Sequence, residues 1–70
     1  MIYEINSTDV DYCIANECYC ICISNDELTA LVSSTRKLDN IEIINEYQYT
    51  EINEVMLSEK YKKICKDCNL

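Results

Sequence analysis

The sequence predicts a small α+β domain, in which an antiparallel sheet carries two helices and a zinc ion ties the two ends of the chain together. Three observations support this prediction. Short alternating apolar runs are typical of strands, two other stretches repeat apolar residues at helical spacing, and six cysteines fall into two distant clusters. We expect one domain over residues 1–70, with a core small enough to need a staple.

The predicted sheet has an N-terminal strand, a hairpin and a later strand. Residues 2–6 form a short alternating run, residues 10–23 hold two such runs around Asn16-Glu17, and residues 41–49 are rich in Ile and Tyr. Since the chain contains no Gly and no Pro, Asn and Asp are expected to make the turns. Period-two alternation in this hairpin would place all four N-terminal cysteines on one face, for either of two loop lengths.

Two helices are predicted, at about residues 25–38 and 58–68. The first begins with the capping-box pattern Ser-Asn-Asp-Glu, and its later apolar residues recur at helical spacing. The second would place Cys65 and Cys68 on the same helical face, where both thiolates can reach one ion. Residues 50–57 fit either the end of a strand or the start of the last helix, and the sequence leaves this open.

The cysteines are predicted to bind one structural zinc ion. We recognise no secretory signal and expect the chain in the cytoplasm, where clustered cysteines bind metal more often than they form disulfides. Because the chain has no His, four thiolates would hold the ion and leave no position for a catalytic water. Buried free cysteines and disulfides are the alternatives, and which two N-terminal cysteines bind stays open. The predicted ligands are Cys13, Cys18, Cys65 and Cys68, with Cys20 as a substitute.

Composition predicts a binding protein rather than an enzyme. Without Gly there is no phosphate-binding loop, and without His there is no His-activated nucleophile. The net charge of −7 disfavours direct nucleic-acid binding and favours a basic protein surface as partner. No apolar run is long enough for a membrane helix, and we expect a monomer. The predicted partner-binding residues, which combine unopposed acidic side chains with tyrosines, are Glu42, Glu46, Tyr47, Tyr49, Glu51 and Glu54.

In size, charge and cysteine layout the chain resembles the zinc-binding phage anti-CRISPR proteins that inhibit Cas9. The Cys13/Cys18 and Cys65/Cys68 pairs and the acidity of most of the chain carry this resemblance. It implies a non-catalytic inhibitor in a bacterial host cell that binds a Cas9-like nuclease, whose basic channel holds the guide–target duplex, and blocks guide or target binding. A zinc-ribbon-like adaptor and a thiol-based metal or redox protein are the other hypotheses. An ordinary solvated surface is the alternative interpretation of the acidic residues.

Overall fold

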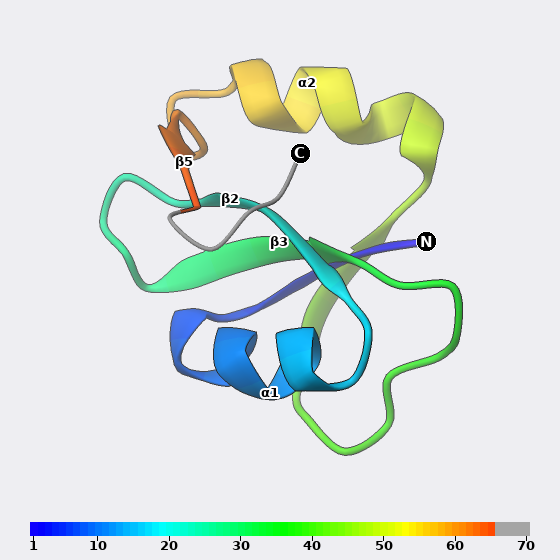
Figure 1. The fold of residues 1–70 in the computed structure, drawn as a ribbon. Helices are drawn as coiled ribbons and strands as arrows, with labels where there is room; N and C mark the ends of the chain where they lie inside the picture. The colour runs from blue at the N-terminus through cyan, green and yellow to red at the C-terminus, as the bar shows by residue number, and fades with distance from the viewer. Residues whose placement is uncertain (66–70) are drawn as a thin grey trace.

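A five-stranded antiparallel sheet forms the centre of the computed structural model, which describes residues 1–65 (Figure 1). Its spatial order is β4-β1-β3-β2-β5. The strands are β1 (Ile2–Asn6), β2 (Tyr19–Ile23), β3 (Thr29–Ser33), β4 (Ile43–Tyr47) and β5 (Lys63–Ile64). The α+β fold class is confirmed, as are the strands predicted near residues 2–6 and 41–49.

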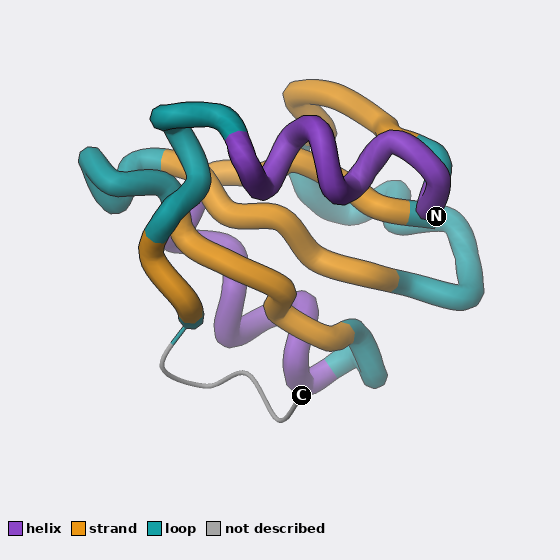
Figure 2. Tube along the Cα trace, turned by 90° about the horizontal axis from the view of Figure 1, so that it is seen from above, coloured by secondary structure: helices purple, strands orange, loops and turns teal. Residues whose placement is uncertain are grey.

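One short helix covers each face of the sheet, as the view from above also shows (Figure 2). On one face lies α1 (Val10–Ala15), which follows the 3-10 turn η1 (Ser7–Asp9). On the other face lies α2 (Ile52–Leu57), which follows the 3-10 turn η2 (Tyr49–Glu51) and resolves the ambiguous segment 50–57 as helical. Neither these helices nor any other part of residues 1–65 forms a helix long and apolar enough to cross a membrane.

The two faces of the sheet form two separate core clusters. Alternation along β1 and β3 sends Ile5 and Val32 toward α1, and Ile2 and Leu31 toward the α2 side. Because both faces are covered, the centres of β1 and β3 are buried throughout, as is typical of strands in the middle of a layered domain. The sheet is therefore the middle layer of three.

The predicted strand over residues 10–15 is wrong, because these residues form α1. Val10, Cys13 and Ile14 are spaced three and four residues apart and turn one helical side toward the core. A run of six residues fits this period as well as the alternation of a strand. Of the hairpin predicted over residues 10–23, only the second strand forms, as β2, and it pairs with β3 instead.

The predicted helix over residues 25–38 is also wrong, because this stretch contains a turn and then β3. Glu27 has a φ of 61°, which a right-handed helix excludes. The Ser24 hydroxyl donates to Asp26 Oδ1 at 2.5 Å, and the Thr29 amide donates back to Ser24 Oγ at 3.2 Å, so the expected capping residue closes a hairpin turn. The apolar run that follows is a buried central strand, which periodicity alone does not distinguish from a buried helix.

The predicted helix over residues 58–68 is wrong for its described part. Residues 58–62 form a loop, and β5 then pairs with β2 through Cys22↔Ile64 and Ile23↔Lys63. Residues 66–68 lie outside the described part of the chain. Tertiary contacts determine the conformation of this segment, since the Tyr61 side chain is buried in the core on the α2 face.

A β-bulge in β2 separates two cysteines that the sequence places on one face. Cys20 pairs with Val32 and Cys22 pairs with Leu31, so Ile21 is an extra residue in the strand. As a result Cys20 joins the core under α1, whereas Cys22 joins the core on the α2 side. The expectation that all four N-terminal cysteines share a face is therefore wrong.

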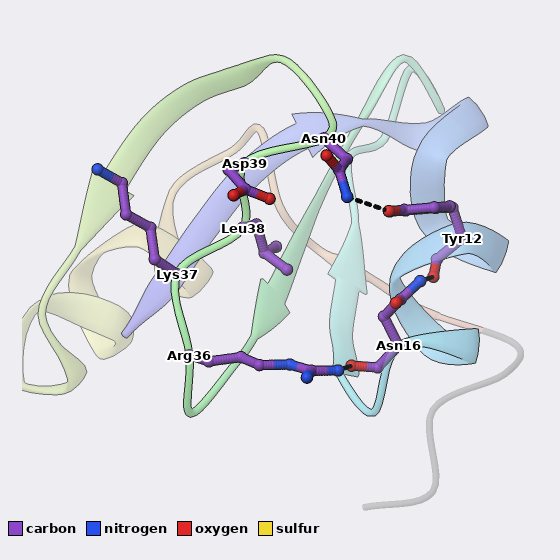
Figure 3. Close-up of a pocket in the computed structure, with 7 residues that line it drawn as sticks. All are labelled: Tyr12, Asn16, Arg36, Lys37, Leu38, Asp39 and Asn40. Atoms are coloured by element: carbon purple, nitrogen blue, oxygen red, sulfur yellow. Dashed lines mark hydrogen bonds between the residues drawn. The ribbon is translucent and has the colours of Figure 1, made fainter.

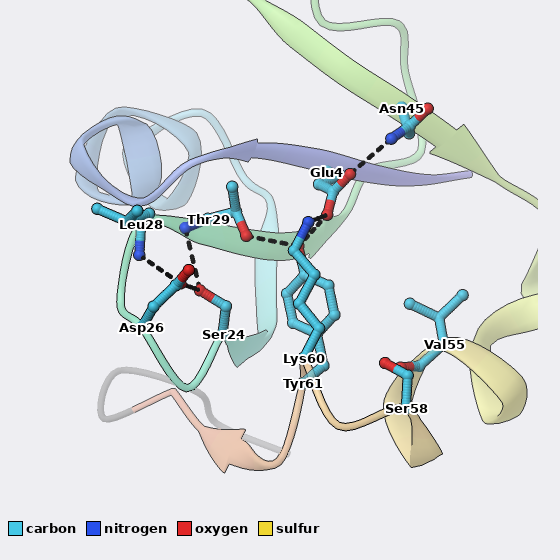
Figure 4. A network of polar contacts seen from close by, with 10 residues as sticks. All are labelled: Glu4, Ser24, Asp26, Leu28, Thr29, Asn45, Val55, Ser58, Lys60 and Tyr61. Carbon is cyan, nitrogen blue, oxygen red and sulfur yellow. Dashed lines mark hydrogen bonds and ion pairs between the residues drawn. The ribbon is translucent and has the colours of Figure 1, made fainter.

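A buried carboxylate connects the centre of the sheet to the last part of the described chain (Figure 4). Glu4 is only 1% exposed and accepts hydrogen bonds from Lys60 Nζ at 2.8 Å, from Asn45 Nδ2 at 2.6 Å and from the Tyr61 hydroxyl. Burial raises the pKa of Glu4, but these hydrogen bonds outweigh burial and hold the pKa below its ordinary value of 4.5. Thr29 Oγ1 lies 2.8 Å from the Tyr61 hydroxyl and extends the network to β3.

Replacing Glu4 with Gln should lower the free energy of unfolding at pH 7 by about 2 kcal/mol, because the amide keeps the volume but loses charge-assisted hydrogen bonds. Urea denaturation measures this loss. Since the folded-state pKa of Glu4 is depressed, its contribution is present above the unfolded pKa of about 4.5 and disappears as the pH falls through the folded pKa. The wild type should lose this stability on acidification, and the variant should not.

Glu42→Gln is the matched control, because Glu42 is exposed and makes no ion pair within residues 1–65. Its free energy of unfolding should change by no more than about 0.5 kcal/mol. Equal stability of Glu4→Gln and the wild type at pH 7 would contradict a stabilising role for the buried carboxylate.

Candidate functional site

Four cysteines lie together in the core on the face that α1 covers. α1 contributes Cys13, the residue before β2 is Cys18, β2 contributes Cys20, and Cys65 follows β5. Cys20 and Cys65 form a disulfide with their Cα atoms 6.2 Å apart. This bond fixes the end of the described chain to β2.

The other two cysteines of this cluster are neighbouring thiols. The Cys18 amide donates to the Cys13 carbonyl oxygen at 3.0 Å, which closes the turn after α1. Burial, with a smaller contribution from Cys18, raises the pKa of the Cys13 thiol to about 11. Cys13 is therefore a neutral thiol at pH 7 and packs as a small apolar side chain.

The predicted zinc ligands are partly brought together. Cys13, Cys18 and Cys65 share the cluster with the substitute ligand Cys20, whereas Cys68 lies outside the described residues. With Cys20 and Cys65 bonded to each other, no three His, Cys, Asp or Glu side chains within residues 1–65 form a group that could hold a metal ion. A thiolate site would require reduction of the disulfide, and the zinc site stays a prediction.

The predicted acidic partner-binding residues lie on one continuous segment, residues 42–54, which we call the acidic segment. It runs along edge strand β4 and continues through η2 into α2. All four of its glutamates are exposed, and within the described chain no ion pair uses any of them. They are Glu42, Glu46, Glu51 and Glu54.

The acidic segment divides its charge between the two sides of the sheet. Glu46 pairs with Tyr3, whose side chain lies in the core under α1, so Glu46 projects on that side. Glu51 and Glu54 belong to η2 and α2, which cover the opposite face. Negative charge therefore surrounds the β4 edge of the sheet from both sides.

The two predicted tyrosines occupy different environments. Tyr47 is half-buried and packs against the core on the α2 side, and this burial raises the pKa of its hydroxyl. Tyr49 is 54% exposed, and its hydroxyl lies 3.0 Å from Ser33 Oγ on β3. Tyr49 is thus available to a partner, whereas Tyr47 mainly supports the fold.

An apolar groove of about 270 Å³ lies between α2 and the sheet, beside the acidic segment. Its floor is formed by Ile2 and Ser33, which pair across β1 and β3, and Tyr19 on β2, which pairs with Ser33, lies at its rim. Its other lining residues are Ile21, Tyr49, Ile52 and Met56. Only Tyr49 of this set is among the residues predicted to bind a partner, although the four-residue spacing of Ile52 and Met56 is a signal for one helical face.

A second hollow of about 250 Å³ lies between α1 and the loop that joins β3 to β4 (Figure 3). Arg36 Nη2 donates to the Asn16 carbonyl oxygen at 3.1 Å, and Asn40 Nδ2 donates to the Tyr12 hydroxyl at 2.9 Å. These contacts fasten the loop to α1. Arg36 and Asn40 therefore have a structural role, which is to hold this loop against α1.

Reducing the disulfide should lower the free energy of unfolding by about 4 kcal/mol, because the bond closes a loop with a sequence separation of 45 residues. Urea denaturation with and without reductant, in the presence of a chelator, measures the difference. Cys20→Ser and Cys65→Ser should each show the same loss. Reductant should then have no further effect on Cys20→Ser, and an undiminished effect would contradict the Cys20–Cys65 assignment.

Comparison with known proteins identifies no relative. No family model matches the sequence, and no curated protein and no solved structure matches it either. The function proposed for the chain therefore rests on its exposed surfaces and its cysteine cluster.

Proposed function

We propose that the protein is a small non-catalytic inhibitor whose acidic segment binds the basic, nucleic-acid-binding surface of another protein and so excludes the nucleic acid. The observation that supports this proposal is the exposed and unopposed charge of Glu42, Glu46, Glu51 and Glu54 around an edge strand. Opposite charge on the partner would steer the encounter and disfavour partners of the wrong sign.

The ion pairs of the described lysines support a negative charge on the acidic segment, because none of these pairs involves a glutamate of the segment. Within the described chain the two ion pairs are Lys60–Glu4 and Lys63–Glu27, so two of the few cations are paired with carboxylates that do not belong to the acidic segment. The chain as a whole carries 13 acidic and 6 basic residues. The field near the acidic segment is consequently negative and falls off over a Debye length of about 8 Å at physiological salt.

The acidic segment is also held in a defined shape. Asn45 on β4 bonds the buried Glu4 carboxylate, and the side chains of Gln48 and Glu51 form a reciprocal capping box around η2. The Gln48 backbone amide donates to Glu51 Oε1 at 3.1 Å. Binding therefore requires little ordering of this backbone, which lowers the entropic cost of association.

The partner we propose is a Cas9-like nuclease, on the basis of the resemblance in size, charge and cysteine layout. Such a nuclease holds its guide–target heteroduplex in a positively charged channel and recognises it mainly through the backbone. An acidic protein competes for the same cations without needing any base-specific contact.

Glu46→Lys and Glu54→Lys should each weaken binding to purified Cas9 about fivefold at low salt, because each reverses a charge of the acidic segment. Affinity measured by interferometry over a salt series tests this. Asp11→Lys is the matched control, since Asp11 is an exposed residue of α1 and its reversal changes the net charge by the same amount. It should leave the affinity nearly unchanged. No binding of the wild type would refute Cas9 as the partner, and equal effects of all three variants would refute the acidic segment as the surface.

The predicted structural zinc remains part of the proposal, with Cys13, Cys18, Cys65 and Cys68 as ligands and Cys20 as the substitute. The support is the shared core cluster of all these residues that lie in the described chain. In the reduced protein four thiolates would hold the ion in a closed tetrahedral site, and its role would be to stabilise the fold.

Protein purified under reducing conditions should contain one zinc per chain by elemental mass spectrometry, and chelation should lower its Tm. Cys13→Ser should lose the metal. Cys22→Ser should keep it, because Cys22 lies in the core cluster on the opposite face of the sheet. Reduced wild type without zinc, or with a melting curve that chelation does not change, would refute the proposal.

A further inference from the structure

We infer that the apolar groove beside α2 receives an apolar side chain that the basic partner presents between Lys or Arg residues. This inference rests on the proposed function and deepens it, because it adds a specific apolar anchor to a surface that charge alone would make attractive to a basic partner. The occupant is a segment of the partner protein. It is neither a small metabolite nor a second copy of this chain.

The groove exists because α2 is too short to cover the end of its sheet face. The helix has six residues, and Ile52, Val55 and Met56 pack only partly buried against the core. They leave the first residue of β2 uncovered, so Tyr19 is 58% exposed on the sheet and Tyr49 is 54% exposed on η2. Large apolar side chains that remain exposed together often mark an interaction site.

The size of the groove fits one large side chain. Its volume of about 270 Å³ lies just below the range of about 300–1,000 Å³ that is usual for small-molecule sites. Ile2 is fully buried at the floor, and the tyrosines stand at the rim. Tyrosines around a pocket that an apolar group can fill are typical of the residues that contribute most to protein–protein affinity.

The negative charge near the groove determines which kind of partner segment can carry the inserted side chain. Glu51 and Glu54 lie on η2 and α2, the same short elements that contribute Tyr49, Ile52 and Met56 to the groove. Both glutamates are exposed. Basic residues on either side of the inserted side chain would meet them, whereas a second copy of the chain would bring like charges together.

Two labelled synthetic peptides test the inference: a Lys-rich peptide with one central Phe, and the same peptide with Ala in place of Phe. The wild type should bind the Phe peptide about tenfold more tightly than the Ala peptide by fluorescence anisotropy, because only Phe fills the groove. Tyr19→Ser and Met56→Ser should each remove this preference. Binding of the Ala peptide, which depends on charge, should not change.

Leu28→Ser is the matched control, because Leu28 is 66% exposed in the β2–β3 turn and does not line the groove. It should keep the full preference for Phe, and circular dichroism should show all variants folded. Equal binding of both peptides, or a preference that Tyr19→Ser leaves intact, overturns the groove. If Glu54→Lys still weakens Cas9 binding in that case, the proposed function stands without the groove. Concentration-dependent dimerisation that Tyr19→Ser abolishes would instead assign the groove to a second copy and overturn the inference.

Discussion

The hydrogen bonds to the Glu4 carboxylate are the constraint on which the arrangement of the sheet and its acidic segment depends. A carboxylate at the centre of a buried strand is tolerated only when its oxygens are hydrogen-bonded. Its partners Asn45, Lys60 and Tyr61 are separated from it by 41, 56 and 57 residues. Asn45 lies within the acidic segment and Lys60 follows α2, so one buried group anchors this part of the chain from both sides.

The last described residues are held on both faces of the sheet by different chemistry. Tyr61 is buried on the α2 side, where it bonds Glu4, and Cys65 is buried on the α1 side, where it bonds Cys20. Between them β5 contributes only two paired residues. A strand this short has little stability of its own, so the two attachments explain how it forms the edge of the sheet beside β2.

The sequence correctly predicts the elements whose pattern is local, and its predictions are wrong where distant contacts determine the structure. Strands β1 and β4 follow from their composition. Residues 10–15 fit a helix and a strand equally, and the left-handed backbone at Glu27 has no composition signal in a chain without Gly. The bulge at Ile21 moves Cys22 to the other face. No rule based on residue spacing predicts this change of face. The pairing of Cys20 with Cys65 depends on the neighbouring positions of β2 and β5.

The charge of the candidate site could be predicted from the sequence, whereas the shape of its groove could not. Acidic residues can be counted in a sequence, but the groove arises where Tyr19 on β2 and Met56 on α2 approach across the sheet from elements far apart in the chain. The two features act at different stages of binding. Charge acts over about a Debye length and raises the rate of encounter, whereas an apolar side chain in a groove acts only on contact and slows dissociation. In the proposed complex, a chain this small would gain both from one segment, because η2 and α2 carry groove residues and exposed glutamates together.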